Sequence, residues 1–442
     1  MVIREYSKVE LVFSSSESEA VKIALVNLRR DLIRTLDCSV TAGGIIRILV
    51  GTVGNLPELD KKADISKLQA EDGTYRKEAF LIQEKDGELL IAGTDRRGTI
   101  YGIYDFCEWL GVSPWYFFAD VPVRRRSEAV IESGYCKVDY PSVEYRGIFI
   151  NDEEELEHWV WRYMGETTIG VKTYEKIFEL LLRLKGNYIW PAMHVNCFNE
   201  NTENAKLADR MGIIVGTSHC DMLLRSNQNE WKPRLQKKGY NDTLYDYSIE
   251  GENRERIHEY WTESVENNKD YDVCYTVGMR GIHDSGFVTK NIDENAELNA
   301  QQKKKKKIEL LGQVISDQRQ ILMDVLGEKR GRQALQTFIP YKEVLDLYDS
   351  GLDLPEDITL IWVDDNFGYM RRYPNQKERT RSGGNGLYYH ASYWAHPGMS
   401  YLFFNSIPLA QTGNELKKCW ESGIRKMWVL NVGALKPLEM DI

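Results

Sequence analysis

The sequence pattern changes at residues 145–153, Tyr-Arg-Gly-Ile-Phe-Ile-Asn-Asp-Glu, where a short apolar segment runs directly into polar side chains. From this point on, apolar segments alternate with amphipathic ones. We expect strands at residues 145–150, 187–192, 213–218, 273–278, 337–341, 359–363, 387–393 and 426–432. We expect helices between them at residues 174–185, 203–211, 254–266, 308–326, 343–348 and 409–421. Nearly continuous apolar strands separated by helices predict a parallel sheet that is covered on its outer face.

Eight strands of this kind within residues 141–442 predict a domain of the α/β class, a (β/α)₈ TIM barrel. The crossover at residues 366–386 is its weakest part, because it is rich in Arg, Asn and Gly and has no clear helical period. About ten residues follow the eighth strand, so we expect the last helix of the barrel to be missing from this chain.

Residues 1–140 predict a separate, small α/β sandwich domain. A helix is expected at residues 19–36, where apolar residues recur at helical spacing, and another at residues 99–110. The dipeptide Asp86-Gly87 separates two apolar runs and is typical of a hairpin turn.

The composition excludes several classes of protein. The 442 residues carry a formal net charge of −10 and are 42% hydrophobic, which is typical of a soluble globular protein. An acidic chain is a poor ligand for phosphate backbones, so nucleic acid is not expected as the main partner. No run approaches the ~18–20 apolar residues of a membrane helix. The start shows no export signal, which favours the cytoplasm, or the periplasm or cell exterior if a leader was removed.

The seven cysteines are scattered and include no C-x-x-C pair. This pattern favours reduced thiols over a disulfide framework or a zinc site.

In a barrel, functional side chains lie at the carboxyl ends of the strands. The polar side chains expected there are Asn151, Asp152, His194, His219, Asp221, Arg280, His283, Asp284, Tyr341, Glu343, Asp364, Asp365, Asn366 and His390. A carboxylate after a strand can also be only the N-cap of the next helix, and both interpretations stay open for Asp152, Asp221 and Asp365. Glu343 is a poor N-cap and Asp284 lies in a glycine-containing loop, so the pattern favours a functional role for these two.

Aromatic residues accompany these strand ends. His390 lies in an aromatic strand, where a histidine is either a core residue or, near the top of a barrel strand, part of the pocket. Trp190, Trp362, Tyr369 and Trp394 are either core residues or platforms on which a sugar ring stacks.

The strand-end motifs resemble a known enzyme family. They are residues 146–153, 190–194, 216–220, 278–286, 338–343, 364–369 and 381–390. Over about residues 80–437 the chain looks like glycoside hydrolase family 115, the xylan α-1,2-glucuronidases, which remove (4-O-methyl)glucuronic acid side chains from glucuronoxylan. The first region, with residues 93–98 as its best stretch, resembles the non-catalytic domain that precedes the catalytic barrel in that family.

The resemblance implies an inverting mechanism, in which an acid and a base stand roughly 6.5–9.5 Å apart with a water between them. By position in the motifs, Glu343 and Asp284 are the expected pair, and Asp364 and Asn366 are near alternatives for holding the water. Which carboxyl group is the acid stays open. Arg280 is the expected partner of the substrate carboxylate.

Further substrate contacts are expected from His219, His283, His390, Asn151, Asp152, Trp190, His194, Tyr341 and Tyr369. The resemblance implies no metal and no organic cofactor. The implied partners are glucuronoxylan or aldouronic acid oligosaccharides, and longer family members imply a homodimer.

The sequence leaves two alternatives open. The residues His219, Asp221, His283, Asp284, Asp364 and His390 could instead surround one or two metal ions in a metal-dependent barrel hydrolase. Against this, no H-x-H motif follows the first strand. The second alternative is a truncated, non-catalytic relative that binds carbohydrate.

Overall fold

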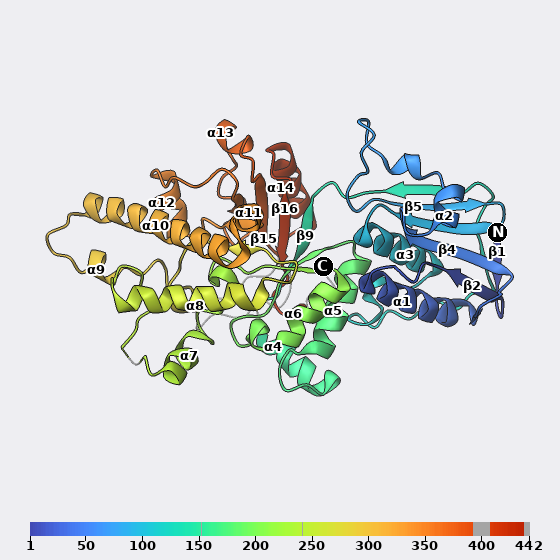
Figure 1. Ribbon diagram of the computed structural model, residues 1–442, viewed down its shortest axis with the longest axis horizontal. Coiled ribbons are helices and arrows are strands. Elements are labelled where there is room, and N and C mark those ends of the chain that lie inside the picture. The colour runs from blue at the N-terminus through green and yellow to red at the C-terminus, as the bar shows by residue number, and fades with distance from the viewer. Residues whose placement is uncertain (152, 241, 392–406, 437–442) are drawn as a thin grey trace. The chain divides into compact units, whose positions relative to one another are not determined.

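A computed structural model describes residues 1–151, 153–240, 242–391 and 407–436 (Figure 1). The chain folds into two compact units. The first contains residues 1–142, 175–187 and 210–213, and the second contains residues 143–174, 188–209 and 214–442. Within the described residues, every helix is too short or too polar to cross a lipid bilayer.

The first unit is built on a six-stranded sheet with the order β3-β2-β4-β6-β5-β8. Its strands are β1 (Val2–Arg4), β2 (Lys8–Val12), β3 (Ser39–Val40), β4 (Ile46–Thr52), β5 (Phe80–Lys85), β6 (Glu88–Gly93), β7 (Glu128–Val130) and β8 (Cys136–Asp139), of which β1 and β7 pair separately. The predicted hairpin is confirmed, because β5 and β6 are antiparallel around Asp86 and Gly87, whose φ angles are 54° and 81°.

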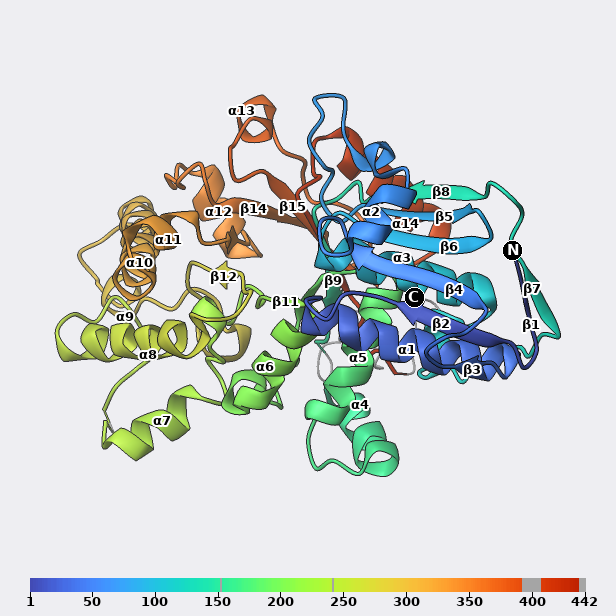
Figure 2. The same cartoon turned by 45° about the vertical axis from the view of Figure 1, so that its right-hand side comes forward.

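Helices cover both faces of this sheet. They are α1 (Glu19–Leu36), which has the predicted bounds, α2 (Pro57–Lys62) and α3 (Arg96–Leu110). Leu59 of α2 packs with Leu90 of β6, whereas Gly102 of α3 lies against Ile91, the next residue of that strand. Successive strand residues point to opposite faces, so α2 and α3 lie on opposite sides of the sheet (Figure 2).

The second unit contains a parallel sheet of eight strands in the order β11-β10-β9-β16-β15-β14-β13-β12. The strands are β9 (Tyr145–Phe149), β10 (Tyr188–Trp190), β11 (Ile214–Val215), β12 (Tyr275–Thr276), β13 (Gln336–Phe338), β14 (Thr359–Val363), β15 (Asn385–His390) and β16 (Met427–Asn431). The first and last of them, β9 and β16, are paired, and a parallel bridge joins Val215 to Val273 beside β12. This curled sheet fits a TIM-like barrel, and the α/β prediction is confirmed.

Helices separate the strands as the sequence predicts. They are α4 (Glu153–Trp159), α5 (Val171–Arg183), α6 (Thr202–Met211), α7 (Trp231–Lys238), α8 (Glu252–Asn268), α9 (Lys290–Asp293), α10 (Ala300–Leu326), α11 (Glu328–Gln333), α12 (Glu343–Asp349), α13 (Gln376–Arg379) and α14 (Leu409–Glu421). The weak crossover before β15 contains only the four-residue α13. The predicted strands at residues 213–218 and 273–278 are mostly loop, because β11 and β12 have two residues each.

Aromatic rings fill the interior of the curled sheet. Trp190 is fully buried, with its ring centroid 5.2 Å from that of Tyr388 and 5.4 Å from that of Phe149. Its indole N–H donates to the hydroxyl of Tyr188 at 2.8 Å. A side chain at Gly216 would collide with that hydroxyl, since a Cβ there would lie 1.9 Å from it.

Candidate active site

Five polar side chains meet where β11, β12 and β13 end, and we call them the strand-end cluster. They are His219, Arg280, Asp284, Lys342 and Glu343. Their loops leave neighbouring strands of a parallel sheet, so residues far apart in sequence converge at one edge. The sequence predicted four of these five as site residues, and it did not single out Lys342.

Arg280 is the centre of the cluster. Its guanidinium is 2% exposed and lies over the Tyr341 ring, 5.6 Å from the centroid. Nε forms an ion pair with Asp284, while Nη1 donates to Oε1 of Glu343 at 3.0 Å and to the Tyr341 carbonyl at 3.2 Å. Burial alone would lower the pKa of Arg280, but the charges of Asp284 and Glu343 raise it. One fixed cation therefore holds both predicted carboxyl groups.

Asp284 is surrounded by donors and positive charge. Nε2 of His219 lies 3.3 Å from its Oδ1, and Nζ of Lys342 donates to its Oδ2 at 2.7 Å. Burial would raise the pKa of Asp284, yet His219, Arg280 and Lys342 together hold it well below its usual range. Burial also lowers the pKa of His219. At neutral pH the cluster thus contains an ionised Asp284 and a neutral imidazole.

Glu343 is the more accessible carboxyl group, with a side chain that is 44% exposed. Its Oε1 accepts from Arg280 and from the backbone N–H of Phe287, at 2.8 Å from the latter. Among the described residues, its Oε2 has no hydrogen-bond partner and stays available to a ligand.

The backbone of these loops adopts rare conformations. Positive φ angles occur at His283 (51°), Asp284 (59°), Lys342 (51°) and Asn366 (71°), each in the loop that follows a strand. Such conformations cost about 1–3 kcal/mol each and cluster at functional sites. The two glycines of the Asp284 loop help it to close, because the N–H of Gly281 donates to the carbonyl of Gly286 at 2.5 Å.

Asp364, Asn366 and His390 extend the site along β14 and β15. Asp364 is fully buried and accepts from the backbone N–H groups of His390 (3.2 Å) and Asn366 (3.3 Å), and it also contacts Nδ1 of His390. The Tyr341 hydroxyl donates to Oδ1 of Asn366 at 3.2 Å, and the Tyr341 ring lies 4.1 Å from that of His219. These contacts join the second group to the strand-end cluster. Water binding by Asp364 and Asn366 stays a prediction.

Two further histidines lie beside Asp284. The ring centroids of His194 and His283 are 5.7 Å apart. Burial, with the neighbouring His283 and His219, lowers the pKa of His194 to about 4, so its imidazole is neutral in mildly acidic solution.

Three more of the predicted contact residues lie on or just after β9, β10 and β14. Trp190 belongs to the core beneath the site, and its ring has no exposed face in this structure. Asn151 donates its backbone N–H to Gly433 at 3.1 Å. Tyr369 is 56% exposed in the loop after β14. Asp152 and Trp394 lie outside the described residues. Substrate contact by these residues stays a prediction.

Lys342 is the functional candidate that the sequence did not single out. An isolated lysine is usually solvated, and the only signals were its place between Tyr341 and Glu343 and the strand end before it.

His219, Cys220 and Asp284 could form a metal site by distance alone, since one ligand atom from each lies within 4.8 Å of the others. The chemistry of these donors does not fit. Arg280 and Lys342 both pair with Asp284, and two cations on one carboxylate oppose binding of a third. Burial also raises the pKa of the Cys220 thiol well above its ordinary value, so loss of its proton to a metal is unfavourable.

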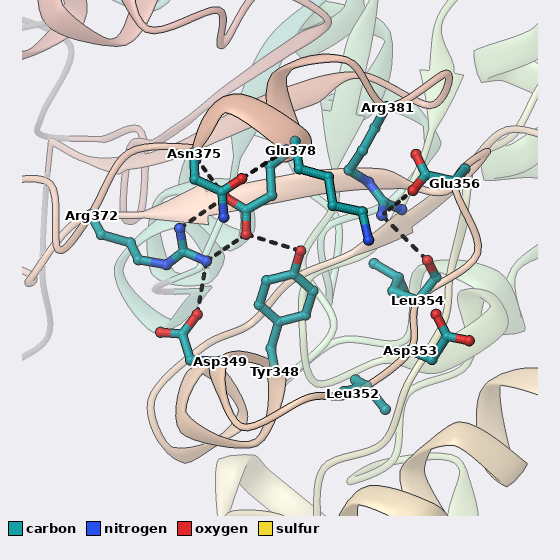
Figure 3. Close-up of a pocket in the computed structure, with 11 residues that line it drawn as sticks. Tyr348, Asp349, Leu352, Asp353, Leu354, Glu356, Arg372, Asn375, Glu378 and Arg381 are labelled. Atoms are coloured by element: carbon teal, nitrogen blue, oxygen red, sulfur yellow. Dashed lines mark hydrogen bonds and ion pairs between the residues drawn. The ribbon is translucent and has the colours of Figure 1, made fainter.

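A separate cavity of about 260 Å³ lies among the segments that lead into β14 and β15 (Figure 3). Tyr348, Asp349, Arg372 and Glu378 form the α13 cluster on its wall. Arg372 donates to Glu378 at 2.7 and 2.9 Å and to Asp349 at 2.8 Å, and the Tyr348 hydroxyl donates to Glu378 at 3.1 Å. Glu378 also completes the capping box of α13. These contacts stabilise the crossover, and the cavity lies away from the strand ends.

Comparison with known proteins gives a consistent result. The model of glycosyl hydrolase family 115 matches residues 138–442. The chain is 36% identical to BtGH115A, a GH115 4-O-methyl-α-glucuronidase described as specific for decorated arabinogalactans, with a TM-score of 0.88. The alignment covers 100% of this chain and 56% of BtGH115A, so the chain spans just over half the length of that relative.

Two more distant structures share the fold alone. A GH138 enzyme targeting pectin rhamnogalacturonan II is 12% identical with a TM-score of 0.57, over 96% of this chain and 46% of its own. CpGH84D is 11% identical with a TM-score of 0.53, over 97% and 63%. No curated protein matches the chain.

Proposed function

The chain belongs to glycoside hydrolase family 115, and from this premise we propose that it removes α-1,2-linked (4-O-methyl)glucuronic acid side chains from glucuronoxylan with inversion at the anomeric carbon. One observation carries the proposal. Asp284 and Glu343 follow neighbouring strands and bind the same buried guanidinium, so two carboxyl groups lie close together, which supports an acid and base pair of a glycosidase.

The surroundings of the two carboxyl groups suggest their roles. Asp284 pairs with two cations that favour its ionised form, so it suits the carboxylate of the pair rather than the proton donor. Glu343 has one oxygen held by Arg280 and Phe287 and the other open, so it suits the acid that protonates the leaving oxygen. Asn366 and the Asp364–His390 pair would position the attacking water and the sugar hydroxyls.

A second substrate is favoured by one comparison. BtGH115A is described as specific for decorated arabinogalactans, and it is 36% identical to this chain over the whole of it. Glucuronic acid decorations on arabinogalactan are therefore the alternative to those on xylan.

The test incubates the purified chain with glucuronoxylan and, in parallel, with arabinogalactan. Released uronic acid is quantified, and ¹H NMR follows the anomer that forms first. Inversion of an α-linkage gives the β-anomer first, and an α-anomer would contradict it. If neither polymer yields uronic acid but both bind, a carbohydrate-binding relative without catalysis is the better account.

Chelation separates the carboxylate pair from a metal mechanism. We expect uronic acid release to be unchanged after dialysis against EDTA. Activity that is lost on chelation and restored by zinc would overturn the two-carboxylate proposal.

A further inference from the structure

The substrate class proposed above carries a negative charge of its own, and two side-chain cations lie in the strand-end cluster. They differ in how they are held. Arg280 is 2% exposed, and its three nitrogens contact Asp284, Glu343 and the backbone carbonyls of Tyr341 and Asp284. Its donors therefore face protein oxygens.

Lys342 remains available. Its side chain is 39% exposed, with one N–H bound to Asp284 at 2.7 Å. Among the residues that the structure describes, its other two N–H groups have no hydrogen-bond acceptor. The ammonium lies 5.0 Å from the centroid of the Tyr341 ring, and Glu343 is the next residue in the sequence. The backbone of Lys342 has a φ angle of 51° and a ψ angle of −122°. A non-glycine residue in this conformation is strained, and such strain persists where the structure holds a side chain in a required direction.

Charge balance points the same way. If Glu343 is protonated as an acid, the cluster holds Arg280 and Lys342 against the single carboxylate of Asp284. The remaining positive charge matches one substrate carboxylate in a partly desolvated site, where such a pair is stronger than in water.

Resting on the proposed function, we infer that Lys342 binds the carboxylate of the uronic acid ring and determines the preference for uronides over neutral glycosides. Arg280 instead positions the two catalytic carboxyl groups. This changes the assignment of the substrate carboxylate from Arg280 to its more accessible neighbour.

The experiment measures binding of D-glucuronate and D-glucose, which differ at the carboxylate, by ligand-observed NMR titration. The wild-type chain should prefer glucuronate. Lys342→Met should weaken glucuronate binding about tenfold or more and leave glucose binding unchanged, and Lys342→Arg should restore part of the preference. Lys377→Met, on the wall of the separate cavity, is the matched control and should behave like the wild type.

The outcomes separate this inference from the proposed function. If Lys342→Met and Lys342→Gln keep the full preference, or weaken both sugars equally, Lys342 does not select the carboxylate, while uronic acid release by the wild type still supports the proposed function. If the wild type shows no preference for glucuronate, both the substrate class and the role of Lys342 are wrong. Circular dichroism of each variant establishes that it is folded.

Discussion

The strand-end cluster and the α13 cluster use the same chemistry in different surroundings. Each places one arginine between two carboxylates and over an aromatic ring, Arg280 over Tyr341 and Arg372 over Trp362. In the α13 cluster, the side chain of Glu378 is 8% exposed, and both of its oxygens accept hydrogen bonds. In the strand-end cluster, Glu343 is 44% exposed with one oxygen open.

The backbones differ as well. Asp284 and Lys342 have positive φ angles, whereas the four residues of the α13 cluster do not. An arginine with two carboxylates is therefore not a sign of function by itself. The signs are an open oxygen, a strained backbone and a position where strands end rather than where they begin.

The largest expected effect comes from matched substitutions of the two glutamates. Glu343→Gln should lower uronic acid release about 10³-fold, because an amide cannot supply the proton, while Glu378→Gln should stay within about threefold of the wild type. Initial rates on glucuronoxylan at equal folded concentration measure both. Equal losses in the two variants would show that the clusters do not differ in function.

For stability we expect the opposite order, with a larger loss in Glu378→Gln than in Glu343→Gln. Glu378 balances Arg372, accepts from Tyr348 and caps α13, so Glu378→Gln should cost about 2 kcal/mol of unfolding free energy. Glu343→Gln should cost less than about 1 kcal/mol because its side chain is half exposed. Urea unfolding of the two variants gives the values. A larger loss for Glu343→Gln would mean that the strand-end cluster is the structural one.

The sequence predicted most of the strands and long helices that position both clusters. The strand at residues 359–363 and the helices at 19–36 and 409–421 have their predicted bounds, because their apolar periods are long and clear. The sequence analysis missed six helices, since each is short and mostly polar: α2, α4, α7, α9, α11 and α13.

The sequence predicted those site residues that directly follow apolar strands. It did not predict which of these side chains contact one another. Asp284, Glu343 and His219 could be found because each follows an apolar strand. The pairing of Arg280 with both carboxyl groups could not be predicted, because periodicity does not report which side chains face one another across separate loops. Lys342 was overlooked for the same reason.

The unfolding free energies of the wild type and of Asp284→Asn should respond differently to acid. The pKa of Asp284 is lower in the folded state than in the unfolded chain, so its stabilising contribution is complete above the unfolded value of about 4 and is lost as the pH falls below it. Between about pH 4 and pH 2, the wild type should lose about 1–2 kcal/mol more than Asp284→Asn. Urea midpoints across this range measure the difference, and parallel curves would contradict the lowered pKa.

The smallest expected effect belongs to His194, which has no histidine counterpart in the α13 cluster. Its folded pKa of about 4 lies below the unfolded value of about 6.5, so the unfolded chain takes up a proton first and stability falls as the pH drops from 6.5 to 4. Between pH 7 and pH 5.5, His194→Gln should remove about 1 kcal/mol of this loss, while His258→Gln on α8 serves as the matched control for losing an imidazole. Thermal unfolding at pH 7, 5.5 and 4 measures the slope of each variant. If the stability of His194→Gln falls with pH as steeply as that of the wild type, His194 is not the cause of the loss of stability in mild acid. The strand-end cluster and the α13 cluster would then differ less in their response to pH than we expect.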